Sequence, residues 1–246
     1  MRFGIRKSVL LAAVVLALFC ASASFADPIV GSLQLRITDG TNSITITDQG
    51  ACVAAGAASC TIGTDASPIV GTVIGIGVVG TWTINNATGL GFPTFAQGHG
   101  DLNSINVNSG GAGTLDVLLT QTGYNANNSG GFGLMWGETL SGAAGSTVLA
   151  SLFGGNSNTA FDTSNPLGSI GPFGLGANSG TGLASGASGA AYSLTARIRI
   201  NANGAVNYSG DFEWNPVPEP TTVLLLGTGL AGIALWSRRK STAKRQ

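Results

Sequence analysis

The chain has 246 residues, of which 43% are hydrophobic and only 9% are charged, with eleven basic and eleven acidic residues. Eight of the basic residues lie near the two ends, so residues 27–215 hold three arginines, no lysine and ten acidic residues, a net charge of about −7. Because nucleic-acid binding requires clustered Lys and Arg to neutralise phosphates, this composition argues against nucleic acid as a partner. An acidic body fits solubility outside the cell and weak binding of divalent cations.

The first 26 residues have the three parts of a secretory signal peptide. Three basic residues open it, residues 8–19 are apolar but too short to span a membrane, and small residues offer a cleavage site ending at Ala26. We therefore expect residues 1–26 to be removed on export. Cys20 leaves lipoprotein attachment as an alternative, although the bulky Phe19 before it does not fit the usual attachment motif.

The next part of the chain alternates between apolar and polar side chains with a period of two, the pattern of half-buried antiparallel strands. Asp39-Gly40 and Asn85-Asn86 have turn composition and are expected to end two of these strands. The strands themselves are expected at residues 33–38, 44–47, 69–79, 81–84, 105–108 and 115–120.

A hairpin is predicted at the end of the body. The even-numbered residues from 192 to 200 are apolar, and so are four of the even-numbered residues from 206 to 214. A three-residue loop at 202–204 places Ile200 opposite Val206, because directly opposed residues of an antiparallel pair share a face. Its Gly204 supplies the left-handed residue that such loops need. In this hairpin Arg197 and Arg199 come near Asp211 on the solvent face.

Between residues 123 and 189 the alternation is weaker, and Gly, Ser, Asn and Ala dominate. Short strands are expected around Trp136 and Leu152, and residues 171–189 have the composition of a long loop. Short strands separated by turn signals every eight to twelve residues predict an all-β domain over 27–215. We expect an antiparallel β-sandwich of the jelly-roll type.

Cys52 and Cys60 are the cysteines of the body. In an oxidising compartment, two cysteines eight residues apart are most simply explained by one disulfide that closes a short loop. The alternative is a redox or metal-binding pair, which needs closer spacing and further ligands.

Few residues offer catalytic or cofactor chemistry, and we expect neither a cofactor nor a metal. Residues 75–80 match G-x-G-x-x-G, but a strand is expected after them in place of the helix that binds a pyrophosphate. His99 is the single histidine of the chain, so any Ser-His-Asp arrangement must use it, with Asp101 two residues away. Asp101 and Asn103 have the start of a calcium-loop spacing without its remaining ligands.

Paired carboxylates are the remaining catalytic possibility, because a glycoside hydrolase needs two acids across a cleft. Glu138 follows Trp136 at a spacing of two, and Glu213 directly precedes Trp214. An aromatic side chain beside an acid suits sugar binding. The interpretation we favour is that both acids are exposed and both tryptophans belong to the core.

The end of the chain has a distinct order of features. A proline-rich motif comes first, residues 221–236 are uncharged and almost wholly apolar, and basic residues follow. Sixteen helical residues span about 24 Å, slightly less than a hydrocarbon core of about 30 Å. Basic residues stay on the cytoplasmic side, so the body lies outside. A buried core helix is the alternative. The motif residues are Val217, Pro218, Glu219 and Pro220, and the basic residues that stop the segment are Arg238, Arg239 and Lys240.

This order resembles the PEP-CTERM sorting signal of exported bacterial proteins. The resemblance implies that residues 216–246 are a sorting signal, with its motif at 217–220, a transmembrane helix at 221–236 and a basic tail at 237–246. It implies an exosortase-type membrane protease as a partner. It also implies anchoring by the C-terminal helix before processing, a later location at the cell surface or outside the cell, and association with exopolysaccharide or biofilm.

From these features we expect an exported protein of the extracellular matrix whose body is not an enzyme, with extracellular polysaccharide as a possible partner. One alternative is a carbohydrate-active enzyme that uses Glu138 and an aspartate. Another is a module that binds glycans or ice. Ice binding favours a flat, regular array of threonines, and the pairs Thr45/Thr47 and Thr81/Thr83 are fragments of such an array.

Overall fold

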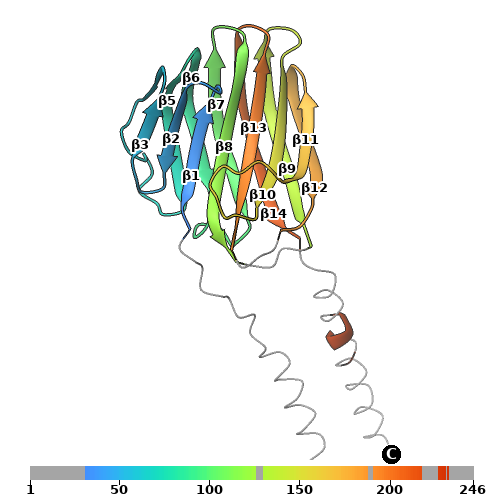
Figure 1. Cartoon of the computed structure of the whole chain (residues 1–246). Coiled ribbons are helices and arrows are strands. Elements are labelled where there is room, and N and C mark those ends of the chain that lie inside the picture. Colours follow the sequence, from blue (N-terminus) through green and yellow to red (C-terminus); the bar gives the residue numbers. More distant parts are fainter. Residues whose placement is uncertain (1–30, 126–129, 188–190, 218–226, 231, 233–246) are drawn as a thin grey trace, which may run out of the picture.

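The computed structural model describes residues 31–125, 130–187, 191–217, 227–230 and 232. The described residues form two seven-stranded antiparallel sheets that pack face to face (Figure 1). Sheet I has the order β11 (Pro166–Phe173), β10 (Thr147–Gly155), β13 (Tyr192–Ala202), β8 (Gly113–Tyr124), β1 (Leu33–Thr38), β2 (Ser43–Thr47) and β3 (Cys52–Ala55). Sheet II has the order β12 (Gly176–Ala184), β9 (Phe132–Gly142), β14 (Val206–Pro216), β7 (Gly100–Ser109), β6 (Trp82–Leu90), β5 (Thr72–Val79) and β4 (Ala58–Cys60).

The expected all-β sandwich is therefore confirmed, and its core lies between the two sheets. Alternating residues point inward, as in β1, where Leu33, Leu35 and Ile37 are buried between half-buried polar neighbours. Large aromatic side chains such as Trp82 and Trp214 fill the interior. Burial of apolar area at about 25 cal/mol per Å² is the main stabilising contribution in such a core.

The predicted terminal hairpin is wrong, because β13 and β14 lie in different sheets. β13 pairs with β8 and β10 in sheet I, whereas β14 pairs with β7 and β9 in sheet II. Ile200 therefore lies opposite Leu115 of β8 and not opposite Val206. Both apolar rows are buried, as the alternation required, but they come from opposite layers of the core. The expected contact with Asp211 is also wrong, since Arg199 pairs with Asp116 of β8.

The expected long loop at 171–189 is likewise wrong. Residues 176–184 form β12, which pairs along its whole length with β9. Its glycines satisfy a packing need, because a Cβ at Gly180 would come within 2.9 Å of Ile170 Cγ2. A strand packed this closely against its neighbour needs small residues, and their composition is easily mistaken for that of a loop.

Asn85-Asn86 is not a turn but the middle of β6. The side chain of Asn85 donates hydrogen bonds to the side-chain oxygens of Asn106 (2.7 Å) and Asn108 (3.3 Å) on the adjacent strand β7. The register between β6 and β7 shifts on both sides of Asn86. The amide groups therefore bridge two strands at an irregularity instead of closing a turn.

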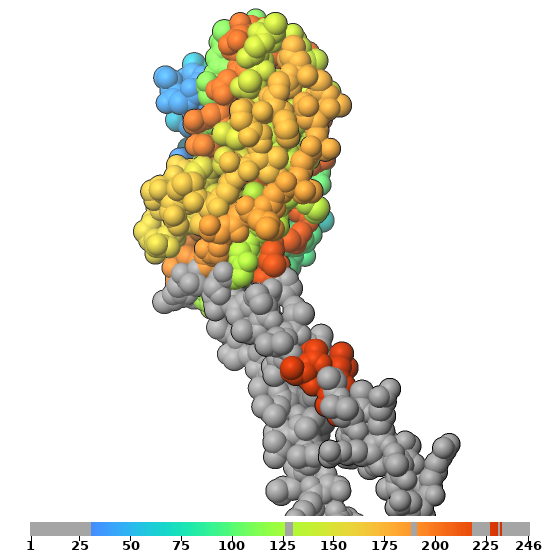
Figure 2. Space-filling model, turned by 90° about the vertical axis from the view of Figure 1, so that its right-hand side faces the viewer, coloured from blue at the N-terminus to red at the C-terminus, as the bar shows by residue number. Residues whose placement is uncertain are grey.

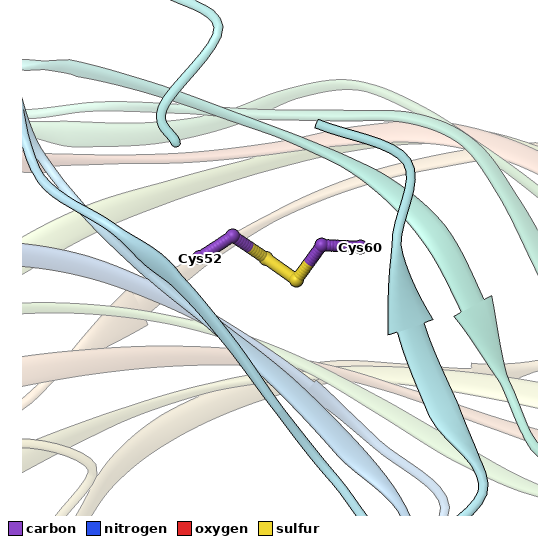
Figure 3. The surroundings of a disulfide bond; sticks show 2 residues. All are labelled: Cys52 and Cys60. Carbon is purple, nitrogen blue, oxygen red and sulfur yellow. A yellow bond between two sulfur atoms is a disulfide. The ribbon is translucent and has the colours of Figure 1, made fainter. Parts of the chain in front are cut away.

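The predicted disulfide between Cys52 and Cys60 is confirmed (Figure 3). Cys52 lies in β3 at the edge of sheet I, and Cys60 lies in β4 at the edge of sheet II. The bond therefore joins the two sheets at one side of the sandwich. At the opposite side β11 and β12 follow one another, and Phe173 packs against Trp136 with ring centroids 5.0 Å apart. Figure 2 looks onto that second side.

The predicted terminal segments lie mostly outside the described residues. These include the signal peptide at 1–26, the motif residues Pro218, Glu219 and Pro220, and the basic residues Arg238, Arg239 and Lys240. Of the apolar segment at 221–236, residues 227–230 and 232 are described and are helical. Within the described part of the chain, no helix is long and apolar enough to cross a membrane. β1 begins and β14 ends at the same end of the sandwich, the lower end in Figure 1.

Candidate functional site

A shallow groove of about 560 Å³ lies on the outer face of sheet II and crosses four adjacent strands. We call it the sheet II groove. Strand alternation forms its walls, because the residues of β12, β9, β14 and β7 that do not point into the core project into it. It is lined by Asp101, Asn103, Met135, Trp136, Gly137, Ser179, Gly180, Thr181, Asp211 and Glu213.

The strand register aligns these residues in two rows. In the first row Thr181 pairs with Met135, Met135 with Glu213, and Glu213 with Asp101. In the second row Gly137 lies between two polar residues, one from β12 and one from β14. A Cβ at Gly137 meets no other heavy atom within 4 Å. The missing side chain in the middle of the second row is what makes the face concave.

Glu213 is held in place by two neighbours. His99 Nε2 lies 2.9 Å from Glu213 Oε1, and Asn215 Nδ2 donates to the same oxygen at 2.5 Å. The His99 ring stacks on Phe95 with centroids 3.9 Å apart and planes 6° apart. The ring stack fixes the imidazole, and the imidazole orients the carboxylate at the rim of the groove.

The two aspartates of the groove differ in their surroundings. Asp211 is exposed, and its Oδ1 accepts a hydrogen bond from the backbone N–H of Ser104 at 2.6 Å. Asp101 is more enclosed. Burial raises the pKa of Asp101, a hydrogen bond from Asn103 at 3.1 Å opposes that shift, and the charges of Glu213 and Asp211 add to it.

The structure separates the two glutamates that the sequence made candidates. Glu213 points outward while Trp214 is 1% exposed, as expected. The expectation that Glu138 is exposed is wrong, because it is only 6% exposed. Glu138 follows Trp136 by two residues, so both side chains point into the sandwich. Glu138 Oε1 accepts a hydrogen bond from Asn178 at 2.8 Å, and burial raises the pKa of its carboxyl group.

The fold brings together residues that sequence reasoning did not connect. His99 and Glu213 are 114 positions apart and form an ion-pair contact. Asp211, Gly137 and Thr181 were not identified as site residues. Outward alternation could have placed Asp211 beside Glu213, but the sequence held no signal that β12 would be a neighbour. Residues 75–80, which match G-x-G-x-x-G, lie in β5 and the turn to β6. No group of three His, Cys, Asp or Glu residues in the described segments is placed to hold a metal ion.

Comparison with known families identifies the C-terminal segment. Residues 216–240 match the PEP-CTERM protein-sorting motif. The chain therefore carries the sorting signal of exosortase substrates, as predicted, and is an exported protein sorted to the cell surface. The match covers the signal and not the β-sandwich.

Curated protein sequences contain no significant match to the chain. Two solved structures share part of its fold. The carbohydrate-binding module TmCBM61, solved in complex with β-1,4-galactotriose, is 10% identical with a TM-score of 0.30, covering 56% of this chain and 90% of that one. The enzymatically active domain of tailspike protein 4 of bacteriophage CBA120 is 16% identical with a TM-score of 0.27, covering 54% of this chain and 19% of that one. Neither similarity bears on the ligand of this protein.

Proposed function

We propose that the β-sandwich is a non-catalytic module that binds extracellular polysaccharide, and that the exported protein acts in the matrix around the cell. The observation that carries this proposal is the sheet II groove, which crosses four strands and is open to solvent. An open groove of this kind admits the middle of a polymer chain, whereas an enclosed pocket admits only its end.

The lining of the groove supplies the groups that sugar hydroxyls need. The carboxylates of Asp211 and Glu213 accept hydrogen bonds, and the hydroxyls of Ser179 and Thr181 both donate and accept them. Met135 is 47% exposed and gives an apolar contact for the less polar face of a sugar ring. Polar groups that fix orientation beside a limited apolar surface are typical of binding sites for small polar ligands.

The position of Glu138 supports the view that the body is not an enzyme. A glycoside hydrolase needs its two acids on the two sides of the scissile bond. Glu138 points into the core, so it does not face a substrate bound in the sheet II groove. Glu138→Gln is therefore expected to leave the products of any polysaccharide incubation unchanged. Hydrolysis by the wild type that this variant lacks would restore the enzyme alternative.

The position of the threonines gives less support to ice binding. Thr45 and Thr47 lie in β2 of sheet I, whereas Thr83 lies in β6 of sheet II and Thr81 directly precedes it. The two fragments therefore belong to different sheets. A regular array on one flat face, which ice binding favours, cannot be built from these four residues.

Affinity electrophoresis of the full chain through gels containing different polysaccharides tests the binding proposal. Gly137→Ile fills the floor of the groove without a clash, so it should abolish retardation while leaving the fold intact. Gly133→Ile is the matched control on the same strand, because Gly133 lies outside the groove and its Cβ meets only Asn215 O at 3.9 Å. Absence of retardation on every polysaccharide, or equal retardation of both variants, would refute the groove as a glycan site.

A further inference from the structure

We propose that the sheet II groove selects polysaccharides whose sugars carry protonated amino groups and rejects those that carry carboxylates or sulfates. This inference rests on the proposed function of the groove and names the charge class of its ligand. It is carried by the way the fold sorts charged side chains between the two faces of the sandwich.

The arginines of the body all lie on the outer face of sheet I. Arg36 of β1 and Arg197 of β13 both pair with Leu118 of β8, one from each side. Arg199 lies two residues further along β13 and pairs with Asp116. The groove lining, by contrast, includes three carboxylates and neither lysine nor arginine. The two outer faces therefore differ in sign, and the groove face is the acidic one.

The cations of sheet I are engaged where they are. The guanidinium of Arg36 lies 4.2 Å from the ring centroid of Phe161, and that of Arg197 lies 4.7 Å from that of Phe153. Cation–π contacts of this kind hold the side chains against sheet I. The carboxylates of the groove therefore have no internal arginine partner on their own side of the sandwich.

The groove carboxylates keep acceptor atoms for a ligand. The hydrogen bonds of Asp211 and Glu213 among the described residues reach Oδ1 and Oε1, respectively, so Asp211 Oδ2 and Glu213 Oε2 remain open. An ammonium group has three donors and no acceptor, and it matches two carboxylates on one face of a strand. A carboxylate or sulfate on a polymer would meet like charges and have no compensating donor.

Two oligosaccharides that differ only in charge test the inference. Oligomers of glucosamine and of N-acetylglucosamine have the same linkage and length, but only the former carries amines. Isothermal titration calorimetry with the full chain at a pH of about 5.5 keeps exposed carboxylates ionised and the sugar amines protonated. Wild-type protein should bind the glucosamine oligomer more tightly, with an affinity that falls as salt is added. It should not bind polygalacturonate.

Charge-neutral variants locate the effect. Asp211→Asn and Glu213→Gln should each weaken binding of the glucosamine oligomer about two- to fivefold, as expected for exposed charge pairs, and should leave the N-acetylated oligomer unchanged. Asp162→Asn is the control, because it removes a carboxylate from the loop whose Phe161 lies over Arg36 on the sheet I side.

The outcomes separate this inference from the proposed function. Equal or tighter binding of the N-acetylated oligomer that is lost in Gly137→Ile would overturn the charge selection and leave the groove as a glycan site. Binding of polygalacturonate in the groove would do the same. Failure to bind any of these sugars or any wider panel of polysaccharides would overturn both proposals.

Discussion

At the scale of single residues, the most unusual group is the buried carboxyl of Glu138. One oxygen accepts a hydrogen bond from Asn178, while Oε2 is buried and has no partner among the described residues. A buried polar atom without a partner costs about 1–3 kcal/mol. Protonation removes the charge that burial penalises, which is why burial raises the pKa of this group.

The stability of the protein should therefore fall as the pH rises through the raised pKa of Glu138. The folded state holds this proton more tightly than the unfolded chain, so the contribution is complete below the ordinary value of 4.5 and is lost above the raised one. Glu138→Gln keeps the acceptor for Asn178 and cannot ionise. Urea unfolding should give a shallower pH dependence for this variant and a gain of about 1 kcal/mol at mildly alkaline pH.

Glu213→Gln controls for the loss of one negative charge in that experiment. Asp101, whose pKa burial also raises, keeps part of the pH dependence in every variant. Identical pH profiles for wild type and Glu138→Gln would show that the buried carboxyl does not control stability.

At the scale of elements, the placement of β13 and β14 in opposite sheets decides which acid supports the arginines. Arg199 donates to both oxygens of Asp116, with Nε–Oδ1 2.7 Å and Nη2–Oδ2 2.6 Å. Asp116→Asn should lower the free energy of unfolding by up to about 1 kcal/mol, the range of a partly exposed pair. Asp211→Asn should change it by less than about 0.5 kcal/mol. The reverse order in chemical denaturation would favour the hairpin that the sequence suggested.

The glycine-rich strand β12 gives a second test at this scale. Gly180 and Gly137 lie on adjacent paired strands, but a Cβ at Gly180 is within 2.9 Å of Ile170, whereas one at Gly137 meets nothing. Gly180→Val should cost about 1–3 kcal/mol by overpacking. Gly137→Val should be neutral or slightly stabilising, because valine suits a strand better than glycine does. Thermal unfolding of the two variants distinguishes a packed strand from a loop, in which both substitutions would be tolerated.

At the scale of the whole molecule, the Cys52–Cys60 disulfide fastens the two sheets at one edge. A loop of this length should contribute about 2–3 kcal/mol in the chain-entropy description. Reduction should therefore lower the midpoint of urea unfolding without abolishing the fold. Free thiols at both positions in the unreduced, denatured secreted protein would contradict the bond, and Cys52→Ser/Cys60→Ser is the matched variant for the reduced state.

Processing at both ends is the second prediction at this scale. Intact-mass analysis of surface material should give a body that begins near Asp27 and lacks the basic tail at 237–246. A host without exosortase should retain the tail, which makes that strain the control for the sorting step. A mature protein that keeps residues 1–26 would refute the signal peptide, and one that keeps its basic tail beside an active exosortase would refute the sorting step.

The sequence determined the properties that depend on neighbours along the chain. Period-two alternation placed β1, β2 and β7, and export with a single cysteine pair indicated the disulfide. The order of motif, apolar segment and basic residues identified the sorting signal, because a protease and a membrane recognise these features in linear form.

Only the tertiary structure decided which strands are neighbours. An apolar row is buried equally well beside its successor in one sheet or facing it from the other, so alternation could not choose between a hairpin and the observed arrangement of β13 and β14. The groove follows from that choice, since it joins β12, β9, β14 and β7 across more than one hundred residues of sequence. Its acidic character arises because long-range pairing put the arginines on one outer face and Asp101, Asp211 and Glu213 on the other.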